Sequence, residues 1–220
     1  LDQGNMQIPV EVIRKLYLPP YASAVDAGAL SVMASFSSWK GTKMHAQQYL
    51  LTDVLKDELG FNGFIVSDWQ GMDQIYPDDY YASIVTSVNA GVDMNMVPYD
   101  YVKFIETMKQ AVDYGDIPES RVDEAVRRIL RVKFALGLFE SPMPDMKYQA
   151  TVRSRGHLEL ARQAVRESLV LLKNENNILP LGKDTPVIFI AGEGANDIGL
   201  QSGGWTLEWQ GKKGNDKQAD

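Results

Sequence analysis

The chain contains no cysteine and only two histidines, and no basic tract stands out along its 220 residues. Without cysteine it forms neither a disulfide nor a thiolate metal site, and two histidines argue against a histidine-rich metal centre. The 22 Lys and Arg against 29 Asp and Glu give a net charge of −7, which argues against binding along a nucleic-acid backbone. No apolar run is long enough to span a membrane. We therefore expect no metal, and neither a nucleic acid nor a membrane as partner.

Hydrophobic residues make up 45% of the chain, which is ample for a globular core. The sequence does not begin with Met, and polar segments stand at both ends, residues 1–5 and 211–217. We expect an internal piece of a longer protein, inactive by itself, whose lack of a signal peptide says nothing about its compartment.

Apolar patterning predicts alternating strands and helices. Short apolar runs typical of buried strands occupy residues 30–36, 64–67 and 91–98, with a loop at 37–41. Helical spacing occupies residues 21–27, 47–59, 80–89, 101–114 and 118–137, and Pro19-Pro20 stands where the first of these helices could start. This order predicts βαβ units and a parallel sheet, hence an α/β fold. Three strands are too few to close an eight-stranded barrel, so in a barrel the first strands would precede Leu1.

The composition changes after Phe139. Residues 140–157, with Pro142 and Pro144, are predicted to form a linker. A helix at 158–173 and a buried strand at 187–191 then predict the start of a second α/β domain. The Gly192-Glu193-Gly194 turn after that strand lacks the third glycine of a dinucleotide fingerprint, so we expect no cofactor.

The segment from Gly63 to Gly71 is the most informative stretch of the chain. Its apolar run stops abruptly at Asp68, which is followed by the large flat ring of Trp69. In barrel-type α/β proteins the active site is built at that end of the strands. A carboxylate beside a stacking ring suggests a sugar held against Trp69 while Asp68 acts on its anomeric carbon. An Asp in this place is also a common turn former or helix cap, and that alternative stays open.

A second aromatic feature is the glycine-bracketed loop at 203–211, which holds Trp205 and Trp209 four residues apart. Tryptophan faces stack on sugar rings with little loss of side-chain freedom. Packing between domains is the alternative explanation for both rings.

Several stretches carry a resemblance to a known family in collinear order. They are Lys43-Met44-His45-Ala46, residues 63–69, Ala90-Gly91-Val92-Asp93-Met94, residues 127–139 (RRILRVKFALGLF), residues 168–174 (SLVLLKN) and residues 203–211. The chain resembles glycoside hydrolase family 3, closest to its two-domain exo-β-glucanases and β-glucosidases. The resemblance implies the C-terminal portion of a (β/α)₈, TIM-like barrel at 1–139, a linker at 140–157 and the start of an α/β sandwich domain at 158–220. It also implies a periplasmic or secreted protein.

The resemblance implies a retaining, exo-acting enzyme that releases glucose from β-glucans or β-gluco-oligosaccharides. Asp68 would be the catalytic nucleophile, forming a glycosyl-enzyme that water then hydrolyses. The general acid/base of this branch is a Glu of the sandwich domain, and neither Glu193 nor Glu208 matches its position.

The resemblance also implies contacts with substrate. Trp69 and Trp209 would form the two walls of a slot for the leaving-side glucose, with Trp205 close by. Met33 and Met96, at the ends of adjacent strands, would line the pocket as soft apolar contacts, although ordinary core filling explains them equally well.

Two substrate-binding positions depart from the plant members of the family. Phe36 stands where they have Tyr, and Gln74 stands where they have an Arg that contacts the outer sugar. Because of these two substitutions the sugar preference stays open, whereas the expected mechanism is unchanged. Lys43 and His45 lie in a matching stretch, but the sequence assigns them no role.

Alternatives within the same scaffold are a β-xylosidase, a β-N-acetylhexosaminidase and a non-catalytic carbohydrate-binding relative. A single-domain hexosaminidase would need neither the sandwich nor the tryptophan loop, so residues 158–211 argue against it. A non-catalytic relative would lose the carboxylate, and Asp68 is present.

Overall fold

The computed structural model describes residues 3–205 and 208–215. The chain forms two compact units, Leu1–Met146 and Lys147–Asp220. None of the helices in the described part is long and apolar enough to cross a membrane.

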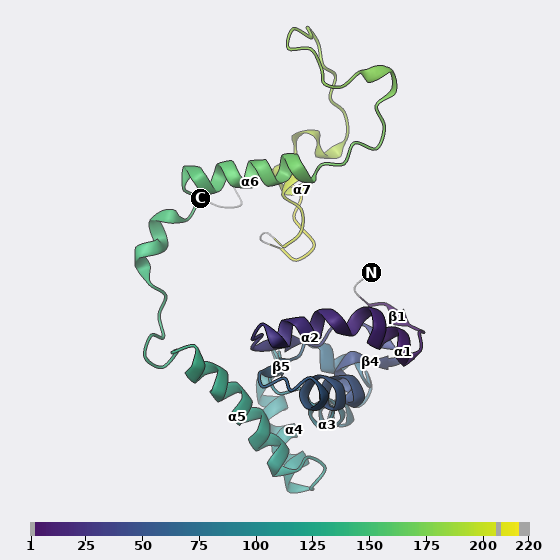
Figure 1. The fold of residues 1–220 in the computed structure, drawn as a ribbon, viewed down its shortest axis with the longest axis vertical. Coiled ribbons are helices and arrows are strands. Elements are labelled where there is room, and N and C mark those ends of the chain that lie inside the picture. The colour runs from purple at the N-terminus through teal and green to yellow at the C-terminus, as the bar shows by residue number, and fades with distance from the viewer. Residues whose placement is uncertain (1–2, 206–207, 216–220) are drawn as a thin grey trace. The chain divides into compact units, whose positions relative to one another are not determined.

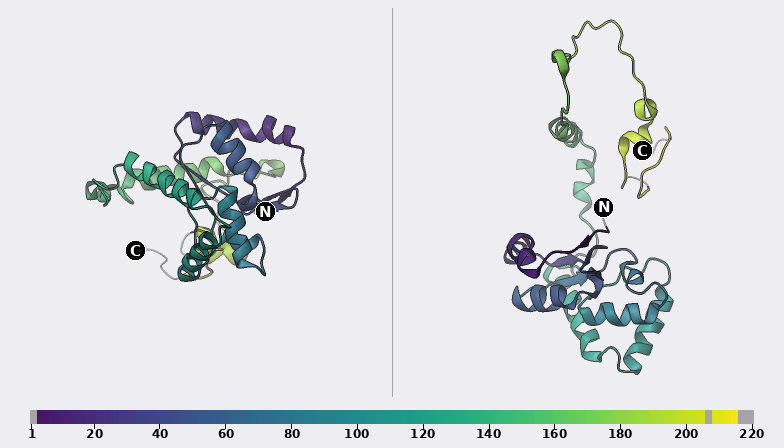
Figure 2. Two further views of the ribbon diagram at one scale, coloured as in Figure 1. Left: turned by 90° about the horizontal axis from the view of Figure 1, so that it is seen from below. Right: turned by 90° about the vertical axis from the view of Figure 1, so that its right-hand side faces the viewer.

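The first unit combines short strands with helices in alternating order, as expected for an α/β protein. Its strands are β1 (Asn5–Met6), β2 (Ser31–Met33), β3 (Ser38–Trp39), β4 (Thr42–Lys43) and β5 (Phe64–Val66). Its helical elements are α1 (Val10–Val12), the π-helix η1 (Ile13–Tyr17), α2 (Leu18–Asp26), the 3₁₀ turn η2 (Met44–Ala46), the π-helix η3 (Tyr49–Glu58), the 3₁₀ turn η4 (Gly71–Gln74), α3 (Tyr80–Ala90), α4 (Tyr101–Asp113) and α5 (Glu119–Ala135). Figures 1 and 2 show the longer helices gathered around the short strands.

The helices of this unit confirm most of the predicted boundaries, because their ends are marked by local signals. The Asp79 carboxylate caps α3 by accepting the Ala82 N–H, and Gly91 ends the helix with a left-handed φ of 117°. Pro118 directly precedes α5. The segment predicted as a helix at 47–59 is the π-helix η3, and α2 begins at Leu18, directly before the Pro19-Pro20 pair where its start was expected.

The parallel pair β2–β5 lies at the centre of the first unit. Ser31 pairs with Phe64 and Met33 with Val66. The strand predicted at 91–98 is wrong in extent, since only the bridge between Val66 and Met94 forms. The Asp93 side chain explains the short pairing: it accepts the Ile65 N–H at 2.8 Å and so replaces a main-chain partner in the ladder.

A small second sheet forms where the sequence predicted loops. β1 runs parallel to β3, and β3 runs antiparallel to β4. The turn between β3 and β4 uses the left-handed residues Lys40 (φ 49°) and Gly41 (φ 84°), the geometry of a tight hairpin. The missed strands are only two residues long, which is too short for a period-two pattern to show.

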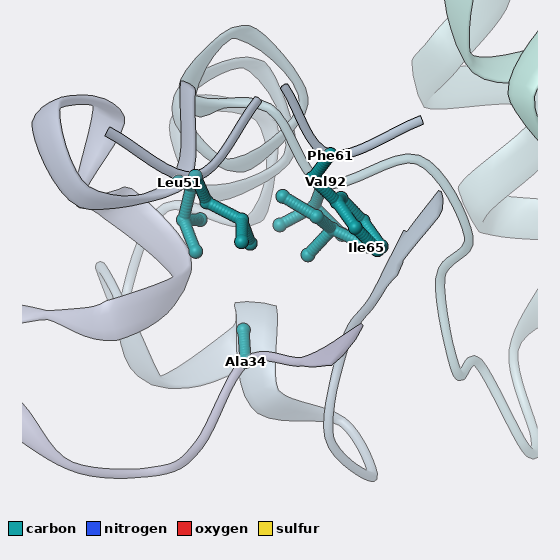
Figure 3. Close-up of a cluster of buried hydrophobic side chains, with 6 residues drawn as sticks. Ala34, Leu51, Phe61, Ile65 and Val92 are labelled. Atoms are coloured by element: carbon teal, nitrogen blue, oxygen red, sulfur yellow. The ribbon is translucent and has the colours of Figure 1, made fainter. Parts of the chain in front are cut away.

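Two apolar clusters hold the first unit together. The first packs the π-helix η3 against the central strands through Ala34, Leu51, Leu55, Phe61, Ile65 and Val92, and Figure 3 shows its labelled side chains turned toward one another. The second joins η4, α3 and α4 through Met72, Ile84, Val88, Ala111 and Ile117. Ile65 of β5 belongs to the first cluster and Met72, directly after the turn that follows β5, belongs to the second, so both ends of the turn are anchored in the core.

A buried ionic group lies beside β5. The Asp93 carboxylate accepts from Lys56 Nζ at 2.9 Å and from Arg121 Nη2 at 2.6 Å. Glu124 contacts Lys56 at 3.3 Å and Arg121 at 3.1 Å. Burial lowers the pKa of Lys56, while the Asp93 charge and hydrogen bond work in the opposite direction.

The second unit has helices but no strand among its described residues, 147–205 and 208–215. Its elements are η5 (Met146–Thr151, which begins at the unit boundary), α6 (Arg155–Ser168), η6 (Glu175–Asn177), η7 (Glu193–Asn196) and α7 (Ile198–Ser202). The helix predicted at 158–173 ends at Ser168. The buried strand predicted at 187–191 is wrong, because the segment is irregular and Phe189 is 90% exposed. An extended run needs neighbouring strands for its main-chain groups, and the described part of this unit offers none.

Candidate active site

Three neighbouring parallel segments end at the same edge of the first unit: β2, β5 and the segment that contains Met94. β2 continues into Ala34, whose N–H donates to the Val66 carbonyl at 2.9 Å. β5 continues into Ser67, whose N–H donates to the Met94 carbonyl at 2.9 Å. Because the segments are parallel, the residues after them meet at their carboxyl ends, where α/β proteins bind ligands.

Asp68 occupies the centre of this edge, half-buried, immediately after Ser67. Its carbonyl accepts from the Ser67 hydroxyl at 2.9 Å and from the Gly71 N–H at 3.1 Å. The Ser67 hydroxyl also accepts the Met96 N–H at 2.7 Å, which ties the turn to the neighbouring segment. The Asp68 side chain turns back to accept the Trp69 N–H at 2.7 Å. The carboxylate thus has a defined direction and a charge-assisted hydrogen bond.

His45 lies directly beneath this turn and is fully buried. Its Nε2 accepts the backbone N–H of Asp68 at 2.9 Å. Burial lowers the pKa of His45 to about 4, the Asp68 charge counteracts this effect, and the Lys43 charge adds to it. The imidazole is therefore neutral at neutral pH and acts as an acceptor.

Trp69 follows the carboxylate, and the residue is 54% exposed. Tyr99 packs edge-on against it, with ring centroids 6.1 Å apart and planes at 79°. Such an edge contact fixes one aromatic ring while leaving a face open. The pair can supply a stacking platform next to a carboxylate.

The other predicted contact residues of the first unit lie around the same edge. Met33 is half-exposed and Met96 is half-buried, so neither is an ordinary core side chain. The Phe36 ring lies 6.4 Å from the His45 ring. Gln74 lies at the end of η4, where its Oε1 accepts from Lys43 Nζ at 2.8 Å.

Lys43 joins two of these contact residues. Besides Gln74, its ammonium group donates to the Phe36 carbonyl at 3.1 Å. The positive charge at this side of the edge is therefore that of Lys43. Gln74 itself serves as a neutral acceptor for it, so the two side chains act as one polar pair.

Trp205 and Trp209 lie in the second unit. Their rings are 6.1 Å apart at 61°, and the Trp205 N–H donates to the Trp209 carbonyl at 3.1 Å. The loop therefore closes on itself and holds both rings exposed, Trp205 at 83% and Trp209 at 56%. Packing of the rings within this unit does not account for such exposure.

A hollow of about 580 Å³ in the first unit does not include Asp68. Met33, Trp39 and Met44 are among the residues that line it, together with apolar side chains of η3. The carboxylate instead borders an open edge. Among the described residues no group of three or more His, Cys, Asp or Glu side chains is placed to hold a metal ion.

Sequence reasoning missed three residues of this arrangement. His45 and Lys43 belong to a stretch that carried the family resemblance, but their partners are 23 and 31 positions away in the chain. Tyr99 follows Val97-Pro98 at the end of a predicted strand, by the same logic that singled out Trp69, and this signal was available in the sequence.

Comparisons with known proteins agree on one family. The family model described as glycosyl hydrolase family 3 N terminal domain matches residues 1–132. A lysosomal beta-glucosidase of Dictyostelium discoideum is 39% identical over 96% of this chain and 27% of its own length. A putative beta-xylosidase of Formosa agariphila is 36% identical over 80% of this chain and 24% of its own.

A solved structure agrees with these relatives. The exo-1,3/1,4-beta-glucanase of a Pseudoalteromonas species has a TM-score of 0.81 and 43% identity, covering 94% of this chain and 26% of its own. The chain thus spans about a quarter of the length of the proteins it matches. With more than half of its residues inside the family model, the chain belongs to glycosyl hydrolase family 3.

Proposed function

We propose that this chain supplies the nucleophile and part of the sugar-binding surface of a retaining, exo-acting β-glycoside hydrolase. The observation that carries the proposal is the place of Asp68, a half-buried carboxylate directly after β5 and beside the exposed ring of Trp69. Its substrates would be β-glucans or β-gluco-oligosaccharides, from which it releases glucose. The names of the beta-glucosidase and exo-beta-glucanase relatives support this substrate class.

The proposed reaction has two steps. An Asp68 carboxylate oxygen forms a bond to the anomeric carbon while the bond to the leaving oxygen breaks, and a general acid protonates that oxygen. A water molecule, deprotonated by the same group, then releases the sugar with the starting configuration. The acid/base would be a Glu outside this chain.

The remaining residues would hold the substrate. In the first unit, Trp69 would stack on the leaving-side sugar, and Met33 and Met96 would line the pocket. In the second unit, the exposed side chains of Trp205 and Trp209 would offer further stacking faces for sugar. Phe36 offers no hydroxyl, and the Lys43–Gln74 pair would present an ammonium group toward the outer sugar in place of an arginine.

The division of the chain follows the same proposal. Residues 1–139 would complete a TIM-like barrel, 140–157 would link it to a second domain, and 158–220 would begin a sandwich. The boundary between the two compact units, at Met146, lies inside the proposed linker.

The test is Asp68→Ala in the full-length enzyme that contains this chain. Hydrolysis of an aryl β-glucoside should be lost, and azide should restore part of the turnover by forming the α-glucosyl azide. Asp78→Ala is the matched control, since Asp78 is an exposed carboxylate in the segment that follows. Wild-type turnover in Asp68→Ala, or a β-configured azide product, would refute the mechanism.

A β-xylosidase is the second candidate, favoured by the 36% identity to the putative beta-xylosidase. The two sugars differ by one hydroxymethyl group, and the comparison of kcat/KM for aryl glucoside and aryl xyloside decides between them.

A further inference from the structure

His45 makes contacts that the proposed reaction does not use. It lies in η2, remote in sequence from the turn at Asp68, yet its side chain is fully buried against that turn. A buried histidine is usually retained for a hydrogen bond, and here the bond is made to the backbone N–H of the proposed nucleophile.

The direction of this hydrogen bond fixes the state of the ring. An N–H donates to Nε2, so Nε2 carries a lone pair and the ring proton resides on Nδ1. Nδ1 is buried and has no hydrogen-bond partner among the described residues. An unpaired buried N–H disfavours folding, so contacts of Nδ1 do not explain why a histidine stands here. The hydrogen bond that Nε2 accepts explains the presence of a histidine at this position.

Gly71 shows how closely the ring follows the turn. A Cβ atom added at Gly71 would overlap the Cε1 and Nε2 atoms of His45. The imidazole thus touches the turn at its first residue, Asp68, and at its last, Gly71. Between them Gln70 adopts a left-handed φ of 50°, and its N–H donates to the Met96 carbonyl at 3.2 Å. The turn is thus held in place by the His45 ring and by the neighbouring segment that contains Met96.

The carboxylate direction depends on the same peptide. The Asp68 side chain accepts the Trp69 N–H, so a tilt of the backbone at this point moves the carboxylate and the Trp69 ring together. A displacement of about 1 Å at a reacting group can lower a rate by about 100-fold.

We propose that His45 is a positioning residue: as a neutral acceptor for the Asp68 N–H, and as the ring that fills the space left by Gly71, it sets the attack geometry of the carboxylate. The inference rests on the proposed function, because it assigns Asp68 the role of nucleophile. It predicts an effect on formation of the glycosyl-enzyme that is much larger than the effect on binding of glucose.

The experiment compares two variants of the full-length enzyme. His45→Gln places an amide oxygen near the former Nε2 and keeps the acceptor, whereas His45→Phe keeps a ring of similar size and removes it. We measure the rate of inactivation by 2-deoxy-2-fluoroglucosyl fluoride, which reports attack by Asp68, and the inhibition constant of glucose. His45→Phe should slow inactivation by about 10- to 100-fold with a much smaller change in the inhibition constant of glucose, and His45→Gln should recover most of that loss.

A stability control separates positioning from general loosening. Ile117→Ala removes buried volume from the second apolar cluster in the segment after α4, rather than in α3, which packs against η2. It should lower the melting temperature while leaving the inactivation rate unchanged. Equal losses in His45→Gln and His45→Phe, or a wild-type rate in His45→Phe, would overturn the inference.

The Asp68 test separates this inference from the proposed function. If Asp68→Ala retains turnover, the proposed function fails whatever His45 does. If Asp68→Ala is inactive and His45→Phe reacts with the fluoride at the wild-type rate, only the positioning role fails.

Discussion

Replacing Asp93 by Asn should destabilise the first unit strongly, although the two side chains have nearly the same shape. Asp93 is fully buried and accepts from Lys56, Arg121 and the Ile65 N–H. Asn keeps an oxygen for the Ile65 N–H but removes the charge that two buried cations face. Loss of one partner in a buried ion pair costs about 3–5 kcal/mol. Because Lys56 retains Glu124 at 3.3 Å, we expect the lower end of that range, about 3 kcal/mol.

The measurement is chemical denaturation of the full-length protein, followed by tryptophan fluorescence, with the shift in midpoint converted through a common slope. Asp123→Asn is the matched control, since its pair with Arg127 is more than half exposed and should contribute less than about 1 kcal/mol. Adding Lys56→Met to Asp93→Asn should recover part of the loss, because it removes the uncompensated buried cation.

The pH dependence of this variant has a defined sign. Burial already lowers the pKa of Lys56, and removing the Asp93 charge lowers it further. Between that native pKa and 10.5 the unfolded chain binds more protons, so the stability of Asp93→Asn should rise toward alkaline pH. A midpoint for Asp93→Asn equal to that of Asp123→Asn would refute the reasoning, and so would a failure of Lys56→Met to recover any stability.

Two further predictions concern the site. The native pKa of His45 is about 4 against 6.5 for the free side chain, so stability should fall as the pH drops from 6.5 to 4, by up to roughly 3 kcal/mol. The charges of Asp68 and Lys43 face this ring. In a series of thermal melts, each at one pH between 4 and 6.5, His45→Gln should remove the contribution of His45 to the dependence of stability on pH. An unchanged dependence would show that other groups cause it. Trp209→Ala should raise KM for gluco-oligosaccharides, since stacking contributes roughly 1–3 kcal/mol, and should leave an aryl glucoside almost unaffected. Equal losses for both substrates would indicate that Trp209 serves packing instead.

Helices of the first unit were predictable because their signals are local. Asp79, Gly91 and Pro118 mark the ends of α3 and α5 in the sequence and in the structure alike. Strands were less predictable, because a strand exists only where a partner pairs with it. The run at 187–191 has the composition of a buried strand, but the described part of its unit gives it no neighbour.

The sequence by itself determined the alternation of helices and strands, the family, and the candidate carboxylate Asp68 beside Trp69. Each depends on residues adjacent in the chain or on a collinear set of motifs. Tertiary structure alone decided what surrounds that carboxylate: His45 on its N–H, Tyr99 against Trp69, and Lys43 on Gln74. These contacts join residues up to 31 positions apart, and the pairing of β2 with β5 and the packing around it bring them together. Local patterns carry no information about such distances, so the chemistry of the edge emerges only from the fold.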